Sequence, residues 1–260
     1  MNTIKTLNVN EVLDNHIPKL TKMVAEGYAD AILICGDAGV GKTYGAEKFL
    51  NQYAKENPNF KWVMVGGDIS PIGLYQTLYE YKDSVLLCDD VDALLSSRCA
   101  NILKNALNTK EDRVVSYKKM NRQLFNAKDM SEEQKYQKYL ESERTMYPNS
   151  FQFNGSCIFI SNKPLDYVEP AVRDRCLSTC YLDFDLEQIV KRIIFLIDKL
   201  NPIKGNLERN DKFEVLQYLY NSAKKKGMRL SLRNFRNALS YRTSFSENNE
   251  WQEMIDLYLN

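Results

Sequence analysis

The sequence predicts an α/β fold, in which a parallel sheet is covered by helices and followed by a purely helical segment. Short apolar strands alternate with helical segments along the first part of the chain, which is typical of a doubly wound parallel sheet. The strands are almost wholly apolar, as expected when helices cover both faces of the sheet. After residue 186 the strand patterns stop and only helical periodicity continues.

Each element follows from the local apolar pattern and its flanking breaks. We expect strands at 31–35, 61–65, 84–88, 157–161 and 179–183. We expect helices at 10–28, 42–53, 71–82, 93–108, 186–200, 211–226, 231–241 and 248–259, the first interrupted near Pro18. Asn201-Pro202, Gly227 and Asn248-Asn249 separate the last four helices. The chain therefore divides into a core over residues 1–185 and a small helical domain over 186–260.

Residues 110–150 form a charged insert in the core, rich in Tyr, Lys and Glu. Its ends, Arg113–Tyr117 and Ser150–Phe153, can pair as a β-hairpin, and residues 131–144 can form a solvated helix between them. A basic cluster with nearby aromatic rings offers contacts to nucleic-acid phosphates and bases: Lys118, Lys119, Arg122, Tyr117 and Phe125. A solvated surface without a partner is the alternative interpretation of this insert.

Composition excludes some classes of protein. The 260 residues carry 35 Lys+Arg against 34 Asp+Glu, a net charge of +1, so no global field attracts nucleic acid or an anionic membrane. The six cysteines form no CxxC pair and the chain has one histidine, which argues against a zinc site and a disulfide framework. No signal peptide and no run of about 18 apolar residues is present. We expect a cytoplasmic protein without a membrane partner.

Residues 36–43 read GDAGVGKT directly after the first strand, and a helix follows. Gly36, Gly39 and Gly41 allow backbone conformations and a close phosphate approach that a β-carbon would prevent. The loop amides and the helix N-terminus favour an anion, Lys42 can neutralise phosphates, and the Thr43 hydroxyl can bind magnesium. Asp37, Ala38, Val40 and Tyr44 complete the expected binding segment. The pattern predicts binding of a nucleoside triphosphate with Mg²⁺, and the family resemblance described below implies that the nucleotide is ATP.

Two carboxylates end the third strand. Asp89 is placed to hold the magnesium ion, and Asp90 to orient an attacking water molecule. Solvated turn residues are the alternative for both. Asp92 is a possible second carboxylate, or an N-cap of the helix that begins at Ala93.

Taken together, residues 10–245 resemble the AAA+ ATPase superfamily. The Walker A loop is Gly36–Thr43 and the Walker B segment is Val85–Asp90. The run Cys157–Asn162 looks like the strand that ends in the sensor 1 asparagine, and Glu169–Arg175 is similar to the arginine-finger segment. The helical tail resembles the lid, in which Leu230–Leu239 looks like the sensor 2 helix.

The resemblance implies a role for three further side chains, two of them with alternatives. Asn162 would contact the attacking water or the γ-phosphate, at the end of a strand adjoining the Walker B strand. Arg175 would reach the γ-phosphate of a neighbouring subunit, and Arg173 competes for that role; either could instead form a structural ion pair with Asp174 or Asp183. Arg233 would reach the phosphates from the lid, with Arg229 and Arg236 as alternatives on the same segment.

An arginine finger acting on a neighbour implies a homo-oligomer, most often a hexameric ring. The family usually has Glu where this chain has Asp90, which is one methylene shorter, so slower hydrolysis is expected. Ser70–Tyr75 lies where the family's first pore loop falls, although a helix start with Pro71 in its first turn explains the same residues.

Two functions remain open at this stage. The chain is either an ATP-driven remodeller of a protein partner, or a DNA-directed motor or loader of a phage or mobile element. The resemblance extends to stand-alone phage-encoded AAA+ ATPases and more distantly to superfamily 3 helicases. The sensor and arginine segments argue against a third interpretation, a P-loop kinase.

Overall fold

The computed structural model describes residues 8–90, 97–108, 112–117, 131, 133, 147–245 and 250–258. These residues form two compact units. The loop–helix unit comprises residues 1–19, 36–48 and 180–260, and the sheet unit comprises residues 20–35 and 49–179. The expected division into a core over 1–185 and a helical domain over 186–260 remains a prediction.

A five-stranded parallel sheet with flanking helices is the centre of the fold, as the sequence predicts. Its strands follow the order β2-β3-β6-β1-β7. Their bounds are β1 Ala31–Gly36, β2 Trp62–Gly66, β3 Val85–Asp89, β6 Ser156–Ser161 and β7 Ser178–Leu182. Every residue of β1 and β6 is buried, whereas β2 at one edge is largely accessible. The apolar runs are therefore the strands that the helices cover on both faces.

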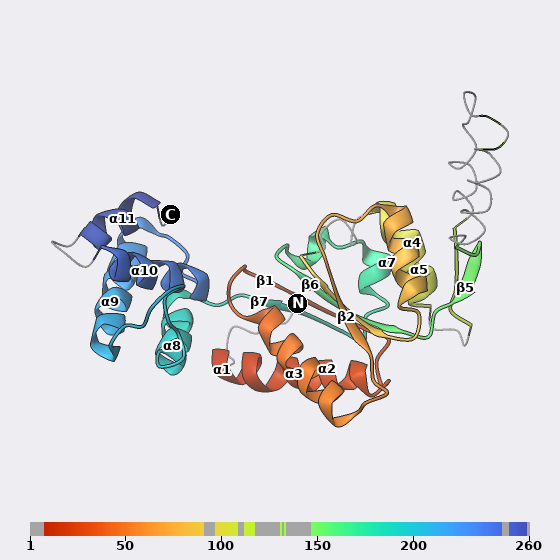
Figure 1. The fold of residues 1–260 in the computed structure, drawn as a ribbon, viewed down its shortest axis with the longest axis horizontal. Coiled ribbons are helices and arrows are strands. Elements are labelled where there is room, and N and C mark those ends of the chain that lie inside the picture. The colour runs from red at the N-terminus through yellow and green to blue at the C-terminus, as the bar shows by residue number, and fades with distance from the viewer. Residues whose placement is uncertain are drawn as a thin grey trace. The chain divides into compact units, whose positions relative to one another are not determined.

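Helices flank this sheet on both sides. Figure 1 shows α4 (Pro71–Glu80), α5 (Ser97–Ala106) and α7 (Pro170–Arg173) on one face. The parts of α2 (Ile17–Ala25) and α3 (Lys42–Glu56) that belong to the sheet unit lie on the other. Ser70 caps α4 by accepting a hydrogen bond from the Gly73 amide at 3.1 Å, and Pro71 is its first residue. The expected helix start at Ser70–Tyr75 is thus confirmed.

The interruption of the N-terminal helix near Pro18 is a π-helical turn. The N-terminal helix runs as α1 (Val9–Glu11), a π-helical turn η1 (Val12–His16) and α2. Proline has no amide hydrogen to donate to residue 14 and its ring crowds that carbonyl, so a regular α-helical turn cannot form there. The Ile17 amide donates instead to the Val12 carbonyl, five residues back.

The ends of the charged insert pair as expected. β4 (Val114–Ser116) and β5 (Ser150–Gln152) form an antiparallel hairpin, with Val115 opposite Phe151. Tyr75 and Tyr79 of α4 pack edge-on against Phe151, with ring centroids 5.1 and 5.3 Å apart. The hairpin is therefore anchored to α4 through aromatic side chains. The basic cluster at 118–122, Phe125 and the expected helix over 131–144 lie outside the residues whose structure is described, apart from Ser131 and Glu133.

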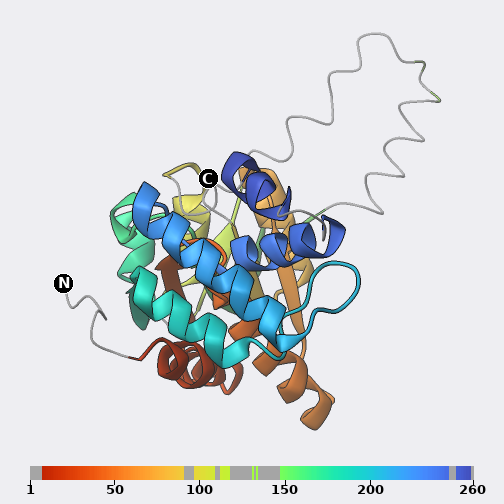
Figure 2. The same cartoon turned by 90° about the vertical axis from the view of Figure 1, so that its left-hand side faces the viewer.

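The C-terminal part is helical, as predicted. It consists of α8 (Leu186–Leu196), α9 (Arg209–Lys226), α10 (Leu232–Ser244) and α11 (Glu250–Tyr258), and Figure 2 shows α8 and α9 side by side. Phe235 and Trp251 are buried in its core. Lys212 is buried as well, and its ammonium donates to the Ile197 carbonyl at 3.3 Å and to Asn201 Oδ1 at 2.8 Å. Lys212 therefore provides a hydrogen-bond donor to a carbonyl at the C-terminal end of α8.

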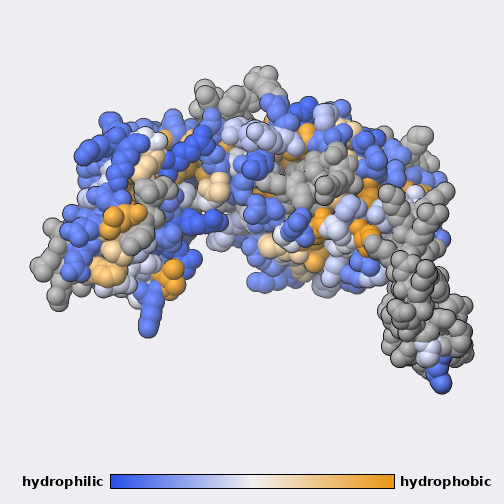
Figure 3. Space-filling view, turned by 90° about the horizontal axis from the view of Figure 1, so that it is seen from above, coloured by the Kyte–Doolittle hydropathy of each residue, from blue (hydrophilic) through white to orange (hydrophobic). Residues whose placement is uncertain are grey.

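The surface carries mainly polar side chains. In the face shown in Figure 3, hydrophilic residues predominate and hydrophobic residues gather in small patches. Within the described part of the chain, no helix has the length and apolar character needed to cross a membrane.

Candidate nucleotide-binding site

The predicted loop has the strand–turn–helix geometry that its chemistry requires. β1 ends at Gly36 and α3 begins at Lys42. Gly36, Gly39 and Gly41 have φ angles of 150°, 74° and 102°, which side chains rarely tolerate. A β-carbon on Gly36 would also lie 2.4 Å from the Leu182 carbonyl oxygen. Two constraints, backbone conformation and close packing, thus require glycine at the start of the loop.

Lys42 occupies the centre of the loop. Its side chain is 4% exposed, and its ammonium donates to the carbonyl oxygens of Gly36 and Asp37, each at 2.7 Å. A buried charge is tolerated only when such dipoles surround it. Thr43 follows in the first turn of α3 and is half-buried, whereas Tyr44 is exposed. The loop therefore wraps around a positive charge beside a helix N-terminus, which is a suitable arrangement for phosphate.

The turn between α9 and α10 packs against this loop within the same unit. The Leu232 amide donates to the Gly39 carbonyl at 3.1 Å. A β-carbon on Gly39 would lie 3.1 Å from the Ser231 side chain and 3.4 Å from the Arg233 β-carbon. Arg233, the predicted sensor 2 residue, therefore starts from a backbone position next to the loop, and its side chain is exposed.

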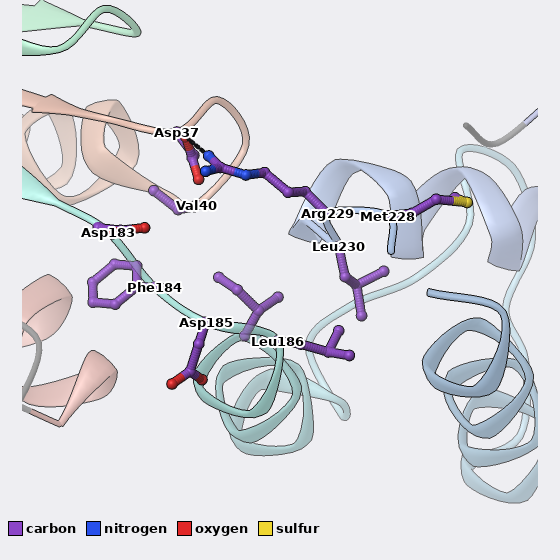
Figure 4. Close-up of a pocket in the computed structure, with 10 residues that line it drawn as sticks. Asp37, Val40, Asp183, Phe184, Asp185, Leu186, Met228, Arg229 and Leu230 are labelled. Atoms are coloured by element: carbon purple, nitrogen blue, oxygen red, sulfur yellow. Dashed lines mark ion pairs between the residues drawn. The ribbon is translucent and has the colours of Figure 1, made fainter. Parts of the chain in front are cut away.

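Arg229, which the sequence left as an alternative to Arg233, contacts the loop directly. Its guanidinium forms an ion pair with the Asp37 carboxylate, and Figure 4 shows the two side chains pointing toward each other. No sequence signal pointed to this pair, because Asp37 and Arg229 are far apart along the chain and each is a common surface residue.

Two cavities adjoin the loop in the loop–helix unit. The smaller, about 190 Å³, is lined by Asp37 and Val40 of the loop together with Asp183, Asp185 and Arg229, among others. It is the pocket drawn in Figure 4. The larger, about 430 Å³, is lined by Gly41 and Tyr44 from the loop side and by Leu196, Leu232, Arg192 and Arg236 from the helices, among others. The larger cavity has the volume and the apolar walls of a small-molecule site.

An ion pair between a buried arginine and a partly exposed aspartate adjoins the larger cavity. Arg192 of α8 is 4% exposed, and its Nη2 donates to Asp14 Oδ1 at 2.7 Å. Its Nη1 donates to Asp14 and, at 2.9 Å, to Asn10 Oδ1. The pair joins the N-terminal helix to α8, and the sequence did not predict it. An arginine in an otherwise apolar helical stripe was the only available signal.

In the sheet unit, two predicted residues meet. β3 ends at Asp89, which lies opposite Ile160 of β6, so Asn162 follows the strand beside the carboxylates. Asn162 Nδ2 donates to Asp90 Oδ1 at 3.0 Å. Asp90 has a φ of 52°, and it is the only non-glycine residue with a positive φ among those described. Such a conformation is uncommon outside glycine, although aspartate adopts it more readily than most residues do.

The candidate arginine fingers also lie in the sheet unit, at the end of α7. Arg173 forms an ion pair with Asp166 at 3.8 Å, a different acid from the two expected. Arg175 donates to the Ala171 carbonyl at 2.7 Å. Asp92 lies outside the residues whose structure is described.

The cysteines carry no sign of thiolate chemistry. All six are free thiols, and no group of three side chains suited to metal binding occurs among the described residues. Burial raises the pKa of Cys88 to about 12 and that of Cys176 to about 12. Burial likewise raises the pKa of Cys180 to about 11, although the Lys42 charge opposes the shift. These three thiols therefore stay protonated at neutral pH and are poor nucleophiles.

Comparisons with known proteins agree with this fold. No model of a known protein family matches the chain. In sequence, the chain is 29% identical over 264 residues to the "Uncharacterized 36.7 kDa protein in nrdC-mobD intergenic region" of Enterobacteria phage T4. The match covers 94% of this chain and 72% of the phage protein.

Solved structures identify the fold class. A point mutant of RuvB from Thermotoga maritima has a TM-score of 0.52 at 14% identity, covering 98% of this chain and 73% of RuvB. Domain III of the replication initiation protein DnaA from Thermotoga maritima has a TM-score of 0.51 at 16% identity, covering 97% of this chain and 92% of that domain. Both are AAA+ ATPases. The chain therefore has the AAA+ P-loop NTPase fold, as the sequence resemblance implies.

Proposed function

We propose that this protein binds ATP in the loop Gly36–Thr43 and hydrolyses it. The observation that carries the proposal is the glycine loop wrapped around the buried ammonium of Lys42, between a strand and a helix N-terminus. The larger cavity, about 430 Å³ beside Gly41 and Tyr44, is our candidate for the base and ribose. Its wall residues Leu196 and Leu232 offer apolar contacts to a base.

Two of the predicted residues carry oxygen donors that suit a magnesium ion. The Thr43 hydroxyl and the Asp89 carboxylate are hard ligands of the kind Mg²⁺ prefers, and both residues are half-buried. The ion would neutralise phosphate charge during the reaction. Asp90 would orient the attacking water molecule, and Asn162 would hold the Asp90 carboxylate in place through the hydrogen bond at 3.0 Å.

Hydrolysis is proposed to take place in a homo-oligomeric ring. Arg175 would then act on the ATP of a neighbouring subunit, with Arg173 as the alternative, and Arg233 would contact the phosphates from the helical part. Tyr167 and Leu177 are exposed on the same segment as Arg175. Exposed aromatic and aliphatic side chains are the kind that subunit contacts bury, which supports an interface here.

We propose that this ATPase remodels a protein partner. The second candidate function is a DNA-directed motor or loader. The DNA-directed role is favoured by the names of two structures of the same fold, the replication initiation protein DnaA and a "DNA replication initiation factor". The initiation factor has a TM-score of 0.50 at 16% identity, and the match covers 96% of this chain and 66% of that protein. The phage origin of the sequence relative fits either role.

The central test is the charge of Lys42. In Lys42→Ala, phosphate binding should weaken strongly and magnesium-dependent ATP hydrolysis should fall to background, because the ammonium at the centre of the loop is lost. Binding of a fluorescent ATP analogue and phosphate release measure the two effects. Lys48→Ala, which removes an exposed lysine from the same helix, is the matched control and should behave as wild type. Unchanged turnover in Lys42→Ala would refute the assignment of the loop.

The same assay separates the two candidate roles. Stimulation of hydrolysis by single-stranded DNA, lost at high salt, would favour the DNA-directed role. If DNA leaves the rate of hydrolysis unchanged at every salt concentration, the role as a protein remodeller is favoured. The mass of the assembly with ATP bound tests the ring.

A further inference from the structure

A negative charge lies inside the loop that is proposed to bind a polyanion. Asp37 is the second residue of the loop, and its carbonyl oxygen accepts a hydrogen bond from Lys42 at 2.7 Å. Its side chain is only 27% exposed, so water screens the carboxylate incompletely. A carboxylate on this loop opposes the binding of each phosphate charge.

The surroundings of Asp37 add further negative charge beside the loop. The smaller cavity beside the loop is lined by three carboxylates, from Asp37, Asp183 and Asp185, and by one cation, Arg229. Asp185 is engaged as the N-cap of α8, where it accepts from the Gln188 amide at 2.8 Å. Without Arg229, the three carboxylates would have no cation among the residues that line this cavity.

Arg229 is held at this corner by the backbone around it. The turn that carries it starts at Gly227, the left-handed C-cap of α9 with a φ of 67°, and ends at Ser231, the N-cap of α10. The hydrogen bond from the Leu232 amide to the Gly39 carbonyl at 3.1 Å fastens the turn to the loop. The ion pair with Asp37 then follows from the position of the turn (Figure 4).

We propose that Arg229 is a built-in counter-ion that neutralises Asp37, so that the phosphate loop accepts ATP. Arg229 acts through Asp37 and not by touching the nucleotide, which distinguishes it from Arg233. It is a positioning residue whose effect is electrostatic. The inference rests on the proposed function, namely that the loop Gly36–Thr43 binds ATP.

The test is a double-mutant cycle on nucleotide affinity. Arg229→Gln should weaken the binding of a fluorescent ATP analogue about tenfold, because it leaves the Asp37 charge unpaired near the phosphates. Asp37→Asn should instead strengthen the binding, by up to about tenfold, because it removes the repulsion and leaves the Arg229 charge unpaired beside the loop. Combining the two changes should restore the affinity to within about twofold of wild type.

Two further readouts separate an electrostatic role from a structural one. The loss in Arg229→Gln should be larger for the ATP than for the ADP analogue, and it should shrink as salt is added. Arg229→Lys, which keeps the charge, should bind as wild type. Arg209→Gln is the matched control, because Arg209 also forms an exposed ion pair, with Asp198 at 3.4 Å, in the same helical part. Urea unfolding confirms that each variant is folded.

Other outcomes overturn the inference. If the double variant binds as weakly as Arg229→Gln, Arg229 contacts the phosphates directly or supports the turn. If Asp37→Asn binds the analogue as weakly as Arg229→Gln does, the Asp37 carboxylate supports the loop and is not a charge that needs a counter-ion. Failure of the proposed function is a different result: wild type and Lys42→Ala would then bind the analogue equally poorly, and the counter-ion role would fall with it.

Discussion

At the scale of single residues, Asp90 is the most informative position. It combines a left-handed backbone, with a φ of 52°, and a hydrogen bond from Asn162 at 3.0 Å. The left-handed backbone and the hydrogen bond from Asn162 together restrict the position of the Asp90 carboxylate. Both features fit a side chain that must hold a water molecule in one orientation.

Asp90→Asn should retain ATP binding and lose hydrolysis by about a hundredfold or more, because it removes the carboxylate that is proposed to orient water and leaves Asp89 in place. Asparagine tolerates a positive φ as well as aspartate does, so the change should not disturb the fold. Analogue binding and phosphate release on the same sample measure the two properties. Normal hydrolysis in this variant would mean that another group, such as Asp92 or Asn162, positions the water.

At the scale of elements, the N-terminal helix and α8 are joined by a buried charge. Arg192 is almost fully enclosed and depends on Asp14 and Asn10 for its hydrogen bonds. A buried guanidinium that loses its carboxylate keeps the desolvation cost without the attraction. The pair therefore matters more for stability than its surface counterparts.

Asp14→Ala should lower the free energy of unfolding by about 2 kcal/mol, less than for a fully buried pair because the Asp14 side chain is partly exposed. Urea denaturation measures the change. Asp198→Ala is the control, since the ion pair of Asp198 with Arg209 is exposed on both sides, and its effect should stay within about 0.5 kcal/mol. Equal effects of the two substitutions would show that the pair of Arg192 with Asp14 stabilises the fold no more than an exposed pair does.

At the scale of the whole molecule, the open question is assembly. The exposed side chains of Tyr167 and Leu177 and the adjacent Arg175 lie on one segment of the sheet unit. The Arg175 guanidinium donates to the Ala171 carbonyl of α7, the helix that ends two residues earlier. A subunit interface would give this arginine a second role, on the phosphates of a neighbour.

Arg175→Ala should lose hydrolysis without losing ATP affinity, because the arginine would serve a neighbouring subunit. Mixing this variant with Lys42→Ala should restore part of the activity, since some interfaces then combine an intact loop with an intact arginine. Phosphate release from the mixture measures the rescue, and Arg173→Ala tests the alternative arginine. Absent rescue, despite proven co-assembly, would favour a role within one subunit.

The sequence alone determined the local features of this protein. The five strands, the glycine loop and the C-terminal helices followed from apolar periodicity and from residues that start or stop elements, such as Pro71 and Gly227. The hairpin that ends the insert followed in the same way. These features depend on neighbours along the chain, so a single sequence contains enough information to predict them.

Only the tertiary structure decided which distant residues meet. The hydrogen bond of Asn162 to Asp90 spans 72 residues, and that of Arg192 to Asp14 spans 178. The strand order β2-β3-β6-β1-β7 likewise brings distant segments together. The ion pair of Arg229 with Asp37 also joins residues that are far apart along the chain. Each of these charged or polar residues is compatible with a solvated surface when it is considered alone. Packing of the elements selects its partner, because ion pairs and hydrogen bonds act over a few ångströms in space, whatever the separation along the chain.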